Sequence, residues 1–162
     1  MTISKGDRLP AATLVQIGAN GPEPVALGER TAGRKVVIFA VPGAFTPTCS
    51  SAHVPSFIRT RDQFVSKGVD EIICVSVNDP FVMQAWGEAT GANAAGIIML
   101  ADADSAFTTT IGMNFDAPPA GLLARSKRYA MLVEDGIVTV MNEETSPGAC
   151  EISAGEGLLD AM

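Results

Sequence analysis

Alternation of strand and helix patterns is the feature that most constrains the fold of this chain. The run KVVIFAV (Lys35–Val41) is β-branched and apolar on both faces, as is typical of a central strand covered on two sides. Two further apolar runs, IICVSV (Ile72–Val77) and GIIMLAD (96–102), are separated from it and from each other by stretches with helical signals. Strands that alternate with helices predict an α/β fold with a largely parallel central sheet.

Two helices are expected between these strands. The first carries apolar residues at spacings of three and four, and Gly68 is expected to end it. Its apolar stripe, interrupted by Arg61, consists of Val54, Phe57, Ile58, Phe64 and Val65. Pro55 lies inside this pattern and is expected to kink the helix, because proline removes an amide donor and crowds the preceding turn. The second helix, PFVMQAWGEATG, is opened by Asn78-Asp79-Pro80.

Two hairpins are expected outside this core. TLVQIG and PVAL flank the turn signal Ala19-Asn20-Gly21-Pro22 and predict an N-terminal hairpin or two short strands. RYAMLVEDGIVTVMNEE predicts a second hairpin with Asp135-Gly136 as its tight turn. These antiparallel strands make the predicted sheet a mixed one. A short helical or irregular stretch is expected over 104–112, and one or two helical turns in the tail 155–162.

Composition limits the domain organisation and the partners. The chain has 162 residues, of which 47% are hydrophobic, so a single domain over 1–162 is expected. A formal charge of -7 argues against nucleic acid and anionic membrane surfaces as partners. No segment resembles a signal peptide or a membrane span, and a cytoplasmic protein is expected. Its cysteines are odd in number and widely spaced, so reduced thiols are expected.

The stretch VPGAFTPTCSSAH (Val41–His53) joins the first buried strand to the first helix. Strand ends of this kind are where open α/β sheets place their ligand sites. Thr46 suits the helix N-cap, Pro47 the first helical position and Cys49 the third. The thiol therefore occupies the position where a capping box has Glu or Gln, so this helix start favours a thiolate.

A functional thiolate at this position also requires a cation from another element. A helix N-terminus favours an anion by typically about 0.3 to 1 kcal/mol and at most about 2, which leaves most of an ordinary thiol protonated at neutral pH. Arg59 and Arg61 lie about 15 to 18 Å further along the same helix, too far to help. His53 is one turn away, but an ordinary imidazole is mostly neutral at pH 7, so we interpret it as structural or peripheral. Cys49 and His53 lack a second ligand pair, so no metal site is expected.

Pro42, Thr46 and Cys49 form a Pro-x-x-x-Thr-x-x-Cys motif, and the whole segment resembles the active site of peroxiredoxins, in particular the peroxiredoxin 5 or type II branch. Further similar segments are KGDRLP (5–10), SVNDPFVMQAW (76–86) and SKRYAMLVEDG (126–136). The resemblance implies a thioredoxin-like fold: a central mixed β-sheet flanked by helices, with an N-terminal β-hairpin extension. It also implies thiol-dependent reduction of hydrogen peroxide and alkyl hydroperoxides in antioxidant defence and redox homeostasis, without a metal or a bound organic cofactor.

The same resemblance implies the roles of four residues. Cys49 attacks the peroxide and becomes a sulfenic acid, Thr46 orients thiolate and peroxide, and Pro42 shapes and shields the loop. The motif SKRYAM places the active-site arginine at Arg128, which supplies the cation that the helix start lacks. Arg125 and Lys127 are neighbours of this position rather than matches.

The sequence leaves the recycling step open. Relatives in the family resolve the sulfenic acid with a second cysteine or with an external thiol. We favour Cys150, in a Pro/Gly loop, over Cys74, which lies in the middle of a strand. The reductant is either thioredoxin or glutathione with glutaredoxin. A non-catalytic redox sensor or partner-binding module is the alternative function, whereas a dithiol oxidoreductase is disfavoured because no Cys-x-x-Cys occurs.

Three aromatic residues are expected in the core: Phe45, Phe81 and Trp86. The family resemblance offers another role for them, at the pocket rim and in a homodimer contact. The apolar segment APPAGLLA (117–124) is expected to reshape the edge of the pocket.

Overall fold

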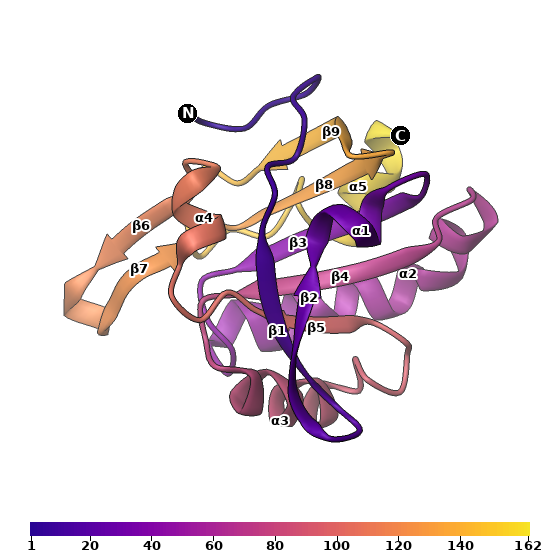
Figure 1. Cartoon of the computed structure of the whole chain (residues 1–162). Helices are drawn as coiled ribbons and strands as arrows, with labels where there is room; N and C mark the ends of the chain where they lie inside the picture. Colours follow the sequence, from indigo (N-terminus) through magenta and orange to yellow (C-terminus); the bar gives the residue numbers. More distant parts are fainter.

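A seven-stranded mixed sheet forms the centre of the molecule in a computed structural model that describes residues 1–162 (Figure 1). The strand order is β2-β1-β5-β4-β3-β8-β9. The three central strands, β3 (Lys35–Val41), β4 (Glu71–Ser76) and β5 (Ile98–Ala101), are parallel, as their alternation with helices predicts.

Antiparallel hairpins extend the sheet at both edges, and both confirm the hairpin predictions. β1 (Thr13–Gly18) and β2 (Gly21–Ala26) pair with each other, and β1 continues the sheet beyond β5. At the other edge, β8 (Tyr129–Glu134) runs antiparallel to β3 and pairs with β9 (Ile137–Glu143). The sheet is therefore the predicted mixed sheet with an N-terminal hairpin extension.

Helices cover both faces of this sheet (Figure 1). On one face, α2 (Val54–Ser66), α3 (Pro80–Thr90) and α5 (Gly155–Ala161) contribute to one apolar cluster. On the other face, α1 (Leu27–Thr31) and α4 (Ala106–Thr110) contribute to a second. Alternate residues of β3 belong to the two clusters, and every residue from 36 to 41 is buried. This explains why KVVIFAV is apolar on both faces.

The ends of α3 follow the expected capping chemistry. The Asp79 carboxylate accepts a hydrogen bond from Val82 N (2.9 Å) at the start of α3, and Gly91, at φ 83°, ends that helix. Gly68, at φ 86°, follows the end of α2. Pro55 lies at the second position of α2, directly after a π-helical turn, η1 (Cys49–His53). The turn that precedes Pro55, where proline removes an amide donor, is a π turn.

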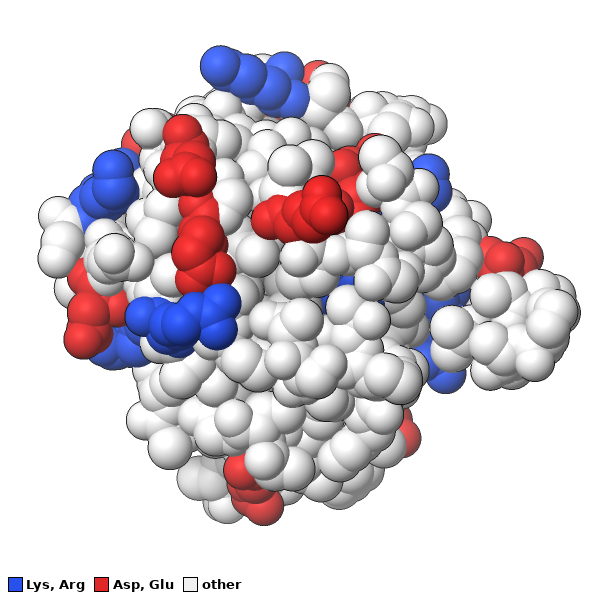
Figure 2. Space-filling model, turned by 180° about the vertical axis from the view of Figure 1, so that it is seen from behind, with Lys and Arg blue, Asp and Glu red and all other residues white.

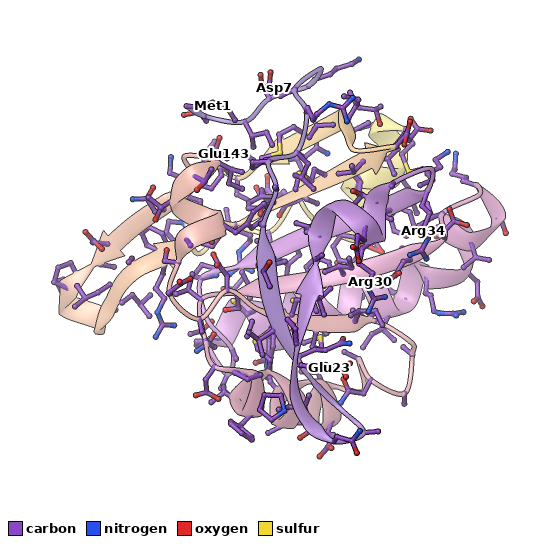
Figure 3. The ribbon with its side chains drawn as sticks, in the orientation of Figure 1. Met1, Asp7, Glu23, Arg30, Arg34 and Glu143 are labelled. Atoms are coloured by element: carbon purple, nitrogen blue, oxygen red, sulfur yellow. The ribbon has the colours of Figure 1, made fainter.

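Ion pairs join α1 to the start of β4. Arg30 and Arg34, labelled in Figure 3, both contact the Glu71 carboxylate, at 2.7 and 2.8 Å. Both arginine side chains are about one-third exposed, so pairs of this kind contribute at most about 1 kcal/mol each.

The structure contains a third hairpin that the sequence analysis does not predict. β6 (Asn114–Ala117) and β7 (Leu122–Ser126), joined by the 3-10 turn η2 (Pro118–Ala120), form a separate two-stranded sheet. It projects from the body of the molecule (Figure 1). Polar and apolar residues alternate only over the four residues of β6, and the apolar run from 117 to 124 is mostly exposed, so the pattern is too short to predict a strand.

Three apolar side chains that the sequence places in the core are exposed: Phe45, Phe81 and Val65. Phe45 and Phe81 are 58% and 61% exposed, whereas Trp86 is fully buried as expected. Phe45 lies in the loop after β3 with φ 64°, and Phe81 lies in the first turn of α3 on its outer side. Val65, placed in the apolar stripe of α2, is 51% exposed. The buried face of α2 instead includes Ser56 and Thr60. Gly155 packs so closely against these two residues that a Cβ at position 155 would clash with them.

None of the helices is both long and apolar enough to span a bilayer. The chain contains no group of three or more His, Cys, Asp or Glu side chains arranged to bind a metal ion.

Candidate active site

Cys49 is fully buried at the start of the π turn, just beyond the end of β3. The helical turn begins at Pro47, and Ser50 N donates to Thr46 O over 3.1 Å, as expected if Thr46 is the N-cap. The Thr46 hydroxyl does not cap an amide. It lies 2.8 Å from Cys49 Sγ and 2.7 Å from Gly43 O, so either of them can accept its proton. Because a hydroxyl has one proton, it donates to Sγ when Cys49 is a thiolate and is free to donate to Gly43 O when Cys49 is a thiol.

Arg128 supplies the cation that the helix start lacks. Its Nη2 donates to Cys49 Sγ over 3.1 Å, and the side chain is 2% exposed. The register of β8 against β3 pairs Tyr129 with Ala40, so the residue before β8 lies beside the end of β3. Nε and Nη2 of Arg128 also donate to Pro147 O, at 3.1 and 3.0 Å, which fixes the plane of the guanidinium.

His53 holds the other side of the same guanidinium. Its Nδ1 accepts from Arg128 Nη1 at 2.9 Å, and its Nε2 donates to Ser153 O at 2.9 Å. Burial and the charge of Arg128 lower the pKa of His53 from 6.5 to about 3, although the hydrogen bond to Ser153 opposes this shift. The imidazole is therefore neutral and acts as an acceptor for Arg128. The sequence suggested a structural or peripheral residue, and the structure places His53 in a buried structural position; its contact with Arg128 was not apparent from the sequence.

The loop around Pro42 is tied to two further elements. Arg125 Nη1 donates to Pro42 O over 3.3 Å, and a Cβ at Gly43 would lie only 2.8 Å from the same nitrogen. A larger residue at position 43 would therefore displace the end of the Arg125 side chain from the loop. On the other side, Asn78 Oδ1 accepts from Ala44 N at 3.0 Å. The sequence identified Arg125 only as a neighbour of the motif, and nothing in it indicated this contact.

The two remaining cysteines differ in their surroundings. Cys74 is fully buried in β4, opposite Phe39 of β3 and Met99 of β5. Burial raises the pKa of the Cys74 thiol well above its usual range, and the neighbouring Cys49 adds to the effect. Cys150 is half-buried in the loop between β9 and α5. Burial also raises its pKa, whereas Arg128 opposes that shift. All three thiols are free.

A cavity of about 160 Å³ lies next to Arg128. Its lining residues come from β6, the link between β7 and β8, the end of β9 and the loop after β9: Phe115, Lys127, Arg128, Glu143, Glu144, Thr145, Ser146 and Pro147. The Cys150 loop therefore contributes both to this cavity and to the contacts of the arginine.

A thioredoxin-like sheet that presents one buried cysteine at a strand end, with a threonine hydroxyl and an arginine on its sulfur, defines a thiol-based redox enzyme. Comparisons with known proteins identify the family. The family model described as Redoxin matches residues 4–159. The chain is 48% identical to Peroxiredoxin-2E-2, chloroplastic, of Oryza sativa subsp. japonica, over 99% of this chain and 73% of that protein. It is 44% identical to Peroxiredoxin-2B of Arabidopsis thaliana, over 99% of this chain and 98% of that protein.

Solved structures agree with these relatives. Reduced Prx3 of Vibrio vulnificus, solved in complex with hydrogen peroxide, has a TM-score of 0.91 and 50% identity, covering 99% of each chain. Peroxiredoxin 5 of Alvinella pompejana has a TM-score of 0.84 and 32% identity, covering 98% of this chain and 97% of that one. The chain belongs to the peroxiredoxin family. It is a thiol-dependent peroxidase with an antioxidant role, as the resemblance of its motif predicts.

Proposed function

We propose that Cys49 reduces hydrogen peroxide and alkyl hydroperoxides by direct attack of its thiolate. Sγ bonds to one peroxide oxygen as the O–O bond breaks, giving a sulfenic acid on Cys49. The other oxygen leaves as hydroxide or alkoxide and takes up a proton, giving water or an alcohol. The observation that carries this proposal is the convergence of Thr46 Oγ1 and Arg128 Nη2 on the sulfur, at 2.8 and 3.1 Å.

Each contact has a function in this step. Arg128 stabilises the thiolate and the charge that develops on the departing oxygen. Thr46 holds the thiolate by one hydrogen bond and, once Sγ forms its bond to oxygen, turns its proton toward the peroxide or Gly43 O. Pro42, held by Arg125, shapes the loop that shields the sulfur. Hydrogen peroxide as a substrate is supported by the 50% identical Prx3, which was solved in complex with it.

Cys150 is the proposed resolving thiol. Its sulfur attacks Sγ of the Cys49 sulfenic acid, forming a disulfide and releasing water. The half-buried Cys150 loop can move without breaking the sheet, whereas Cys74 is paired between two strands. Thioredoxin, or glutathione with glutaredoxin, then reduces the disulfide by thiol–disulfide exchange.

The protein is also proposed to form a homodimer through an apolar patch beside the active site. The patch consists of Phe45, Phe81 and Leu123, each more than half exposed. Hydrogen bonds from Ala44 to Asn78 and from Arg125 to Pro42 hold their three segments together. Seen from behind, the lower part of the molecule near α3 has few charged side chains, whereas most charges lie higher on that face (Figure 2). Exposed apolar patches of this kind mark protein interfaces.

A cytoplasmic location is part of the proposal. Chloroplastic and mitochondrial proteins are both among its relatives, whereas the name of Peroxiredoxin-2B carries no organelle. Fractionation of the source cells, with a marker for each compartment, tests the location.

One experiment tests the chemistry. The reduced protein receives one equivalent of hydrogen peroxide, the peroxide is followed by stopped flow, and the product is peptide-mapped without reductant. Rapid consumption with a Cys49–Cys150 disulfide is expected, and Cys150→Ser is expected to stop turnover with thioredoxin. A Cys49–Cys74 disulfide, or a persistent sulfenic acid, would exclude Cys150 as the resolving thiol. A reaction no faster than that of a free thiol would favour a non-catalytic sensor or binding module.

A further inference from the structure

Glu144, the residue after β9, is a buried carboxylate held by hydrogen bonds rather than by an ion pair. Its side chain forms no salt bridge, and the residue is 9% exposed. One oxygen, Oε2, accepts three hydrogen bonds: from Glu151 N at 2.7 Å, Ser153 N at 2.8 Å and Ser153 Oγ at 2.6 Å. A buried charge is stable only when hydrogen bonds compensate its lost hydration, and here all the donors come from one short segment. The carboxylate therefore holds residues 151–153 in place.

This segment directly follows Cys150, and the loop contacts the catalytic arginine network on both sides of that cysteine. Three residues before Cys150, Pro147 O accepts two hydrogen bonds from Arg128. Three residues after it, Ser153 O accepts from His53, whose ring in turn contacts Arg128. The backbone of Glu144 completes the connection, because its N donates to Arg128 O at 3.0 Å. The position of the Cys150 loop and the orientation of Arg128 are thus linked through Glu144.

Resolution by Cys150 requires this arrangement to open. In the reduced protein the two thiols are not bonded, and Cys49 is fully buried beneath Arg128. A disulfide needs the Cα atoms of its two cysteines within about 7 Å and a defined geometry of the sulfurs. A displacement of Cys150 toward Cys49 moves the residues joined to it on both sides, and so pulls Glu151 and Ser153 away from the carboxylate.

We propose that Glu144 is a positioning residue that latches the Cys150 loop in the reduced enzyme and thereby sets the rate of Cys49–Cys150 disulfide formation. The proposal rests on the proposed function in one respect, the role of Cys150 as resolving thiol. The step itself needs no further reactant: the sulfenic acid of Cys49 and the thiol of Cys150 give a disulfide and water. While the latch is closed, Pro147 and Ser153 keep Arg128 on the sulfur for the reaction with peroxide. When it opens, Cys150 is free to approach.

Two substitutions separate the geometry of the latch from its charge. Glu144→Asp keeps the charge but shortens the side chain by one methylene, so that it no longer reaches both amides. Glu144→Gln keeps the length but removes the charge. Glu143 provides the matched control, because it is the preceding residue on β9 and pairs instead with Lys127 at 3.3 Å (labelled in Figure 3). Ser153→Ala is a milder variant that removes one of the three donors and leaves the two backbone donors intact.

The first readout is amide hydrogen exchange in the reduced protein. Ala149 N and Ala154 N donate to Ser146 O and Glu151 O, so neither depends directly on the carboxylate. Their exchange therefore reports opening of the loop. In both Glu144 variants it is expected to be at least about tenfold faster than in the wild type and in Glu143→Asp, because hydrogen bonds to a charged acceptor are lost. Unchanged exchange in both Glu144 variants would contradict the proposal that Glu144 holds the Cys150 loop in place.

The second readout is the rate at which the disulfide forms after Cys49 has been oxidised by one equivalent of peroxide. It is expected to rise in both Glu144 variants and, to a smaller extent, in Ser153→Ala, but not in Glu143→Asp. If amide exchange were faster but the Cys49–Cys150 disulfide formed no faster, then Glu144 would not set the rate of disulfide formation. If no protein, including the wild type, forms a Cys49–Cys150 disulfide, then Cys150 is not the resolving thiol. Faster exchange in the same samples would still support Glu144 as the latch of the loop.

Discussion

Arg128 donates from Nη1 to Nδ1 of His53 across 2.9 Å, and both side chains are almost completely buried. The contact requires a neutral imidazole with its proton on Nε2, which the hydrogen bond to Ser153 O also requires. Protonation of His53 would direct an N–H toward the guanidinium and place two positive charges together. The position of the arginine that contacts Cys49 Sγ thus depends on a histidine that stays uncharged.

The neutral state of His53 predicts a pH dependence of stability. Its pKa in the folded protein is about 3, against an ordinary 6.5, so between these values the unfolded chain binds a proton that the folded protein excludes. The free energy of unfolding should therefore fall with falling pH, by about 2 kcal/mol from this residue between pH 7 and 5. His53→Gln keeps a donor and an acceptor but does not titrate. Urea unfolding at both pH values, under reducing conditions, should show that the variant loses about 2 kcal/mol less, and an equal loss would contradict the assignment.

Loss of the guanidinium at Arg128 should slow the reaction with peroxide by two orders of magnitude or more, on the order of the effect of removing a transition-state donor. Stopped-flow oxidation of Arg128→Met by hydrogen peroxide measures this effect directly. Arg59→Met is the control, since Arg59 pairs with Glu156 on the surface at 2.9 Å and should leave the rate unchanged. Wild-type rates in Arg128→Met would remove the arginine from the mechanism.

The hydroxyl of Thr46 should be needed, and its methyl group dispensable. Thr46→Val retains the shape but has no donor for Cys49 Sγ, and a fall of about 10- to 100-fold in the rate of peroxide consumption is expected. Thr46→Ser restores the donor and should recover most of the rate. If valine and serine behaved alike, the 2.8 Å contact would have no part in catalysis.

Cys74 should be unreactive toward alkylating reagents and should not be needed for peroxide consumption. Its burial raises its pKa, and no side of the strand is open to reagents, so iodoacetamide at pH 8 should modify Cys150 well before Cys74. Peptide mapping after timed alkylation gives the order. Cys74→Ala should keep the rate of peroxide consumption within about threefold of the wild type, because the thiol does not contact the reacting atoms. A Cys74 that reacts as fast as Cys150 would argue for an opening of β4.

The apolar patch predicts a dimer that a charge disrupts. Phe81→Glu places a carboxylate in the proposed interface and should shift the protein to a monomer in sedimentation velocity or light scattering. Val65→Glu is the matched control, as Val65 is an apolar residue on α2 with 51% exposure outside the patch. A monomeric wild type, or a Phe81→Glu variant that remains a dimer, would refute this interface.

Local pattern predicted much of the architecture because burial repeats with the period of each element. The apolar run at β3, the Asp79-Pro80 start of α3 and the Asp135-Gly136 turn each have an explanation within a few neighbouring residues. The β6–β7 hairpin was missed because it projects from the sheet and its apolar residues are exposed. For the same reason Phe45 and Phe81 were wrongly assigned to the core, since hydrophobicity indicates burial only where other elements pack against the residue.

The candidate site likewise has one part that the sequence predicts and another that only the tertiary structure shows. The sequence by itself determined that Cys49 lies one turn into a helix, three residues after Thr46, and that its thiolate requires a cation from elsewhere. Only the tertiary structure decided how Arg128 is held, by His53 on one side and by the Cys150 loop on the other. These contacts join residues 75 to 100 positions apart at His53–Arg128 and His53–Ser153, and 19 apart at Arg128–Pro147. Such pairs depend on the register of β8 against β3 and on the path of the loop after β9, which no local periodicity encodes.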